Sequence, residues 1–142
     1  MFLLNYKRIS TVINFLLVLL FVYTGTSKLL GHQVFKEQLE QLHFLQPLGG
    51  FISVTLPVTE IISGLAIAFK PTMRWGLWLA ALLMTIFTAY VGFMLAGDNT
   101  KLPCSCGGVM KAMSWKTHLW FNILFTLLAW ANIYLTDIRK RE

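Results

Sequence analysis

Two cysteines, one residue apart, are the residues of this sequence best suited to chemistry. Cys104 and Cys106 lie in the stretch LPCSCGG, and the chain has no other cysteine. Because two residues of extended chain span about 7 Å, the upper limit for the Cα atoms of a disulfide, a bridge between them needs a bent backbone and should be strained. Strain raises the reduction potential, so the spacing favours a redox-active pair that oxidises other thiols.

The surroundings of the pair favour the reactive thiolate. Positive charges near a cysteine stabilise its ionised form, which is the attacking species. Ser114 is predicted to cap a helix that starts near Trp115, and this helix would direct the positive end of its dipole toward the loop. Three lysines also lie nearby: Lys101, Lys111 and Lys116.

A histidine follows the cysteines at the start of the last apolar run. His118 and Asn122 are one helical turn apart, so they should share a helix face. His118 is therefore predicted to be a general base for thiol deprotonation. The alternative is a histidine that only makes a hydrogen bond at the membrane interface.

Two other interpretations of the cysteine loop stay open. One is a structural disulfide, although closing so short a loop removes little chain entropy. The other is a Cu(I) site, because thiolates, thioethers and imidazole together suit a soft metal. Its ligand set would be Cys104, Cys106, Met110, Met113 and His118.

An acidic residue interrupts the second apolar run. Glu60 is at its middle, where an ionised carboxylate is costly, and Lys28 near the end of the first run is the expected partner. The functional interpretation makes Glu60 a proton carrier or a ligand of a quinone, with Asn122 and Trp115 completing a quinone site. The structural interpretation is a buried ion pair that fixes the register of the helices.

The composition predicts a membrane protein. Of the 142 residues, 56% are apolar and 13% are charged, whereas soluble domains have about 45–50% and about 25%. Apolar runs near 20 residues long cross a bilayer as helices. We therefore expect an all-α, antiparallel four-helix membrane bundle forming a single domain over residues 1–142. The four runs are 9–30, 51–69, 75–96 and 118–135.

Two further features qualify this arrangement. Residues 32–47 place apolar side chains at helical spacing between charged ones, which predicts a short amphipathic helix between the first two spans. The first run has an alternative interpretation as a secretory signal peptide, because Lys7 and Arg8 precede it and small residues follow its apolar part.

The basic residues predict an orientation. Lys and Arg at both termini and in the short loop 70–74 would lie on one side of a four-span protein. The positive-inside rule places both termini in the cytoplasm and the cysteine loop in the periplasm of a bacterial inner-membrane protein. The net charge of +6 forms no basic stripe with aromatic residues, so the sequence predicts no nucleic-acid partner.

The order of these features resembles the DoxX-like superfamily of four-helix membrane proteins, and in particular its MauE, or methylamine-utilisation, branch. The matching stretches are TGTSKLL, LPVTEIISGLAI, and PCSCGG followed by W-x-x-H-x-x-x-N. The resemblance implies a redox-associated membrane protein that acts beside a thioredoxin-like partner in maturing disulfide-rich proteins. It assigns Cys104 and Cys106 as the redox pair, and Glu60 and Lys28 match the superfamily's polar positions.

Together these features predict a membrane thiol-disulfide oxidoreductase that exchanges disulfides with a partner protein during the maturation of exported proteins. Cys104 and Cys106 would carry the reaction, with His118, Glu60 and Lys28 managing protons or an electron acceptor in the bundle, for which a quinone is the candidate. The main alternative is a non-catalytic subunit of a larger membrane complex, in which the cysteines form a structural bridge.

Overall fold

The computed structural model describes residues 2–97 and 114–141, and these residues are helical apart from short connections. One 3-10 turn, η1, accompanies five α-helices. In chain order the elements are α1 (Phe2–Leu30), α2 (His32–Glu40), η1 (Gln46–Leu48), α3 (Gly49–Ala68), α4 (Met73–Ala96) and α5 (Trp115–Arg141).

Four of these helices are long and apolar enough to cross a membrane. The spans are Leu4–Leu30, Gln46–Ala68, Met73–Ala96 and Trp115–Ile138. They confirm the all-α four-span fold predicted from the sequence. The first helix begins earlier and the last ends later than the apolar runs, because helical backbone continues through the charged residues at both ends of the chain.

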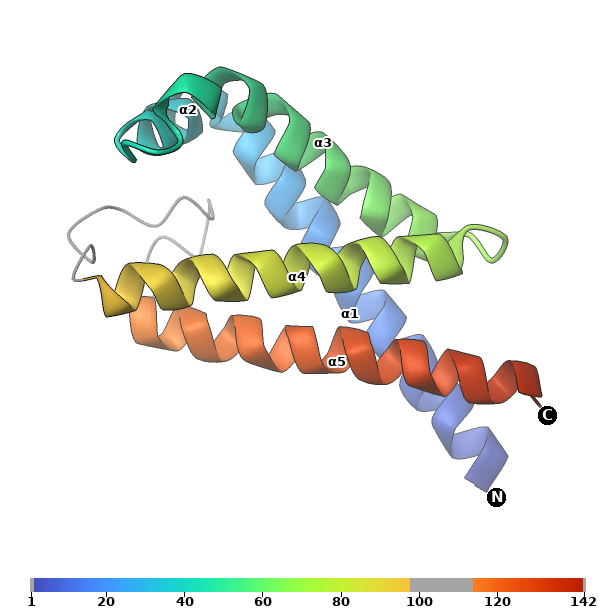
Figure 1. The fold of residues 1–142 in the computed structure, drawn as a ribbon. Helices are drawn as coiled ribbons and strands as arrows, with labels where there is room; N and C mark the ends of the chain where they lie inside the picture. Colours follow the sequence, from blue (N-terminus) through green and yellow to red (C-terminus); the bar gives the residue numbers. More distant parts are fainter. Residues whose placement is uncertain (1, 98–113, 142) are drawn as a thin grey trace.

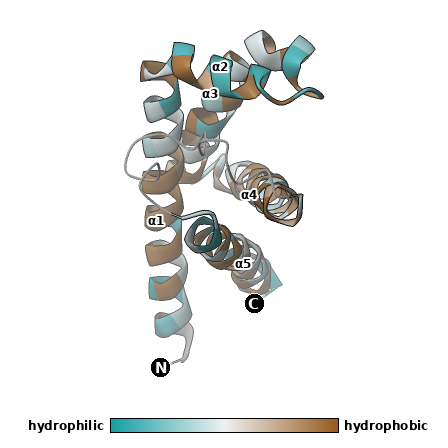
Figure 2. Cartoon of the chain, turned by 90° about the vertical axis from the view of Figure 1, so that its left-hand side faces the viewer, coloured by the Kyte–Doolittle hydropathy of each residue, from teal (hydrophilic) through white to brown (hydrophobic). Residues whose placement is uncertain are grey.

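The four long helices form two pairs that cross. Helices α4 and α5 run side by side in opposite directions, and α1 packs mainly against α3 (Figure 1). Figure 2 shows α1 along its length while α4 and α5 are seen nearly end-on, so α1 crosses this pair steeply. The termini and the α3–α4 turn lie at one end of the bundle, which we call the termini end. Helix α2 lies at the opposite end, which we call the α2 end.

The amphipathic helix predicted between the first two spans is present as α2. It buries Phe35 and Leu39 against the bundle, while Figure 2 shows that it also carries hydrophilic residues. Ser53 Oγ on α3 lies 3.0 Å from His32 Nε2 at the start of α2. The helix ends at Glu40, before the predicted limit, and the chain then turns into η1.

Polar side chains join three helices at the termini end. Asn132 Nδ2 on α5 donates to Asn14 Oδ1 on α1 over 2.6 Å, and Ser10 Oγ donates to Asn132 Oδ1 over 2.7 Å. Arg74 at the start of α4 forms an ion pair with Asp137 of α5 at 3.1 Å. These bonds satisfy polar groups that would otherwise be costly near lipid.

A glycine lets α1 and α3 approach closely near the α2 end. A Cβ atom at Gly25 would lie 2.7 Å from Ile61 Cγ1 and 2.8 Å from the backbone oxygen of Pro57. Real Cβ atoms do not approach other atoms so closely, so only glycine fits. Gly25 precedes Lys28 by about one turn, and the close contact therefore sets the distance from Lys28 to α3.

We expect Gly25→Ala to lower the free energy of unfolding by about 1–3 kcal/mol, because the added methyl group overpacks the α1–α3 contact. Thermal unfolding in detergent, followed by circular dichroism, measures the loss. The matched control is Gly92→Ala on α4, where an added Cβ meets nothing within 4 Å. Equal stability of the two variants would contradict a close contact at Gly25.

Candidate functional site

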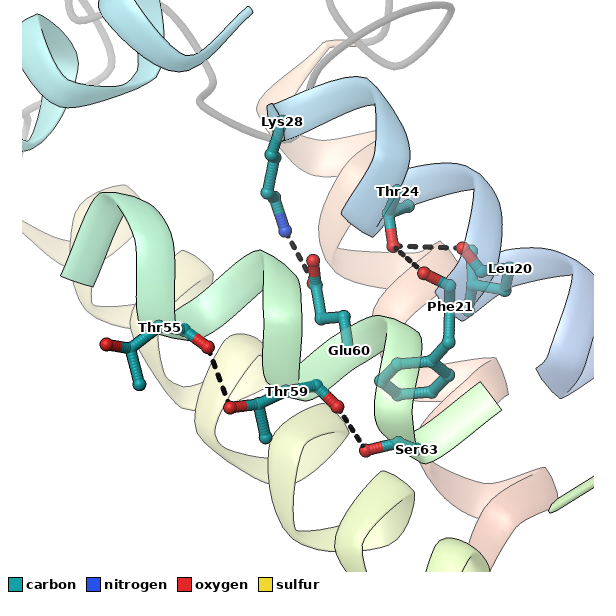
Figure 3. A network of polar contacts seen from close by, with 8 residues as sticks. All are labelled: Leu20, Phe21, Thr24, Lys28, Thr55, Thr59, Glu60 and Ser63. Carbon is teal, nitrogen blue, oxygen red and sulfur yellow. Dashed lines mark hydrogen bonds and ion pairs between the residues drawn. The ribbon is translucent and has the colours of Figure 1, made fainter. Parts of the chain in front are cut away.

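A buried ion pair joins α1 to α3. Lys28 Nζ lies 2.5 Å from Glu60 Oε1, and the two side chains are only 5% and 1% exposed. Figure 3 shows them pointing toward each other across the space between the two helices. The pairing predicted from the sequence is therefore present. Charges within a membrane span need such a partner, because lipid offers neither water nor counter-ions.

Local sequence explains how the pair is positioned. Pro57 lies one turn before Glu60 inside α3, and its own backbone oxygen faces Gly25 of α1. Lys28 is in the last turn of α1, where a cation interacts favourably with the negative end of the helix dipole. Its ammonium also lies 4.8 Å from the centroid of the Phe87 ring on α4, within the range of a cation–π contact.

A small polar cavity adjoins the pair. Its volume is about 30 Å³. Half of the side chains that line it are polar and come from three helices, and the other half are apolar. Glu60 is one of the lining residues, and its Oε2 is buried and makes no hydrogen bond to the described residues. The cavity is large enough for one water molecule, which needs two to four polar partners. The polar residues that line it are Thr24, Lys28, Glu60, His118 and Asn122.

The N-terminus of α5 places His118 beside this cavity. Thr117 N donates to Ser114 Oγ over 3.3 Å, so Ser114 is the N-cap predicted from the sequence. His118 N donates to the Ser114 backbone oxygen over 2.9 Å. His118 is 1% exposed and Asn122 is 5% exposed, and both line the cavity, as their predicted common face requires. The imidazole is thus one turn from the point where the segment 98–113 joins α5.

Several of the predicted site residues lie outside the described residues. The redox pair therefore stays a prediction, and so does the Cu(I) site, of which His118 alone is described. Trp115 is described and half-buried, but it does not line the polar cavity. Residues 2–97 and 114–141 hold no group of three His, Cys, Asp or Glu side chains that could bind a metal. The predicted residues beyond these ranges are Cys104, Cys106, Met110 and Met113.

Sequence reasoning missed two residues around the ion pair. Thr24 lines the polar cavity, and its hydroxyl donates to the Leu20 backbone oxygen over 2.9 Å. Its position one turn before Lys28 was a usable signal, since such residues share a helix face. Phe87 contacts Lys28 from α4. Nothing in an apolar run distinguishes this phenylalanine from those that face lipid.

Removing one member of the ion pair should cost much more than removing both. We expect Lys28→Met to destabilise the protein by about 3–5 kcal/mol, because Glu60 would keep an unpaired buried charge. The double variant Lys28→Met/Glu60→Met should recover most of this loss. A double-mutant cycle of unfolding free energies measures the coupling. If the two single changes simply add, the ion pair does not hold α1 and α3 together.

The comparisons with known proteins place the chain in a family. Residues 6–135 match the family model described as methylamine utilisation protein MauE. No curated protein and no solved structure gives a match. The matched range includes Lys28, Glu60, His118 and the segment with both cysteines; the wider DoxX-like relationship stays a prediction. The match covers most of the chain, and the protein therefore belongs to the MauE family of membrane proteins.

Proposed function

We propose that this protein is a membrane thiol-disulfide oxidoreductase whose redox centre is Cys104 and Cys106. The observation that supports the proposal most is the polar cavity with its ion pair. It lies at the α2 end, where Gly97 and Ser114 flank the segment that contains both cysteines. Buried charged side chains in a membrane span are costly, so they are usually retained for a function.

The proposed reaction is an exchange of disulfides with a partner protein. A thiolate of the partner attacks the sulfur of Cys104, the Cys104–Cys106 bond breaks, and Cys106 leaves as a thiolate. A second partner thiolate then attacks the mixed disulfide and releases Cys104. The partner loses two electrons and two protons, and the cysteine pair gains both. Strain from the short spacing favours this direction.

The polar residues beside the segment would handle the protons. His118 and Glu60 line the same cavity, and Glu60 Oε2 makes no hydrogen bond to the described residues. In this proposal, one water in the cavity carries a proton taken from a thiol between the imidazole and the carboxylate. Lys28 holds the carboxylate in place through its hydrogen bond to Glu60 Oε1. These three residues lie on three different helices, so the packing of the helices brings them together.

The location proposed for this reaction follows from the charges. Lysines and arginines at the termini end would lie in the cytoplasm of a bacterial inner-membrane protein. The cysteine segment would then face the periplasm, where disulfides form. There a thioredoxin-like protein, or another exported protein with reactive thiols, is the proposed partner. A role in methylamine utilisation agrees with the family description.

Trapping tests the redox centre directly. In cells that express Cys106→Ala, the Cys104 thiolate can still attack the disulfide of the oxidised partner, which is the reverse of the exchange. We expect Cys104 to remain covalently attached to its partner, because Cys106 is no longer present to attack this mixed disulfide and release the partner. Non-reducing electrophoresis with mass spectrometry identifies the complex. Cys104→Ala is the matched control and should trap much less. Absence of any adduct, with a reduction potential below about −300 mV for the purified pair, would indicate a structural bridge in an accessory subunit.

His118→Gln should slow thiol exchange by about 10²-fold or more, because glutamine makes hydrogen bonds but cannot accept the proton. The rate is measured with the purified protein and a peptide dithiol, and thermal unfolding shows whether the fold is kept. His43→Gln, at an exposed histidine of the α2–η1 connection, is the control. An unchanged rate in a folded His118→Gln protein would remove His118 from the mechanism.

A further inference from the structure

A second and larger cavity adjoins Lys28 on the side of α2 and α4. Its volume is about 310 Å³, which reaches the range of pockets for small organic molecules. Side chains of α2, α3, α4 and the α2–η1 connection line it, and they are almost entirely apolar. Four of them are aromatic: Phe35, Phe44, Phe87 and Tyr90.

Among the described residues that line this pocket, Lys28 alone carries a charge, on its ammonium group. One of its three N–H groups donates to Glu60 Oε1. The rings of Phe87 and Phe35 lie 4.8 Å and 5.8 Å from the nitrogen, and both rings also line the pocket. The ammonium therefore stands between the polar cavity and the apolar pocket, and it has donors in excess of its single bond to Glu60.

These properties limit the chemistry of the ligand. Apolar walls with several aromatic rings suit a flat ring with a hydrophobic tail, which would reach the pocket from the bilayer. The rim includes Ile86 and Phe44, which are 53% and 58% exposed. At its inner end the ligand must accept a hydrogen bond from Lys28.

Charge decides between two kinds of membrane lipophile. Glu60 already neutralises Lys28, so the carboxylate of a fatty acid would leave a net negative charge buried among apolar side chains, at a large cost. A neutral carbonyl oxygen can accept the hydrogen bond without adding charge. We propose that this pocket binds the head group of an isoprenoid quinone, with a ring carbonyl on Lys28. The polar cavity of about 30 Å³ beside Glu60 and Asn122 has no room for such a ring.

A quinone here would also supply the oxidant that the exchange reaction needs, and this step rests on the proposed function. Two thiols that form the Cys104–Cys106 bond lose two electrons and two protons. A quinone that takes up both becomes a quinol. The binding site itself does not depend on the cysteines.

Photolabelling tests the site. The full chain in phosphatidylcholine vesicles is illuminated with an azido-substituted short-chain ubiquinone, and labelled peptides are identified by mass spectrometry. We expect the label within residues 35–45 and 86–91, with competition by unlabelled ubiquinone and not by oleate. Label spread over all lipid-facing helices, or equal competition by oleate, would overturn the proposal.

Two isoleucines offer a matched pair of variants. Ile86→Trp at the rim should reduce specific labelling about tenfold or more by filling the mouth of the pocket, a change equivalent to about 1.4 kcal/mol. Ile62→Trp should leave it unchanged, because Ile62 is 55% exposed and does not line the pocket. Both positions are exposed, so both proteins should fold. Equal labelling of the two variants would place the quinone elsewhere.

The role of the ammonium needs a variant without an unpaired charge. Lys28→Met/Glu60→Gln removes the donor and both charges, and we expect it to lower specific labelling severalfold. Undiminished labelling would contradict a hydrogen bond from Lys28. The cysteine variant Cys104→Ser/Cys106→Ser should label normally while losing thiol exchange. If the unmodified protein labels in the pocket but shows no exchange, the proposed function fails and the quinone site stands.

Discussion

The structure depends on a pair of opposite charges placed where lipid surrounds the protein. Lys28 and Glu60 are both almost fully buried, and neither would be tolerated there alone. Their pairing requires α1 and α3 to come closer than side chains normally allow, which Gly25 permits. It also requires α4 and α5 to close around the carboxylate and exclude lipid. The packing of the α2 end is therefore largely a consequence of this pair.

The same pair divides the α2 end into two chemically different regions. On one side, Glu60 lines a cavity the size of a water molecule together with hydroxyl, amide and imidazole side chains, and its Oε2 makes no hydrogen bond to the described residues. On the other side, Lys28 borders aromatic and aliphatic side chains under α2. Proton transfer needs the first environment, and a lipophilic ring needs the second. The contact between Lys28 and Glu60 thus joins the cavity proposed for proton transfer to the apolar pocket proposed for the quinone.

Much of this arrangement was predictable because lipid makes polar residues conspicuous in a sequence. The four spans follow from the apolar runs, and the pairing of Lys28 with Glu60 and the Ser114 cap follow from polar residues at particular places in and beside those runs. The steep crossing of α1 and the apolar pocket were not predictable, since they depend on how the helices pack against one another. Phe87 illustrates the limit: its role comes from its neighbours, and its own run contains other large apolar residues. The cysteines lie beyond the described residues, so their spacing remains the basis for their predicted role.

The near coincidence of the two charges has an electrical consequence. Moving one elementary charge through a membrane potential of about 100 mV changes its energy by about 2.3 kcal/mol. Lys28 and Glu60 are in direct contact, so they lie at almost the same depth and the work on one cancels the work on the other. The resting protein should therefore be insensitive to voltage at this site. Protonation of the carboxylate would leave the ammonium as a single charge inside the field, and proton uptake would then become coupled to the membrane potential.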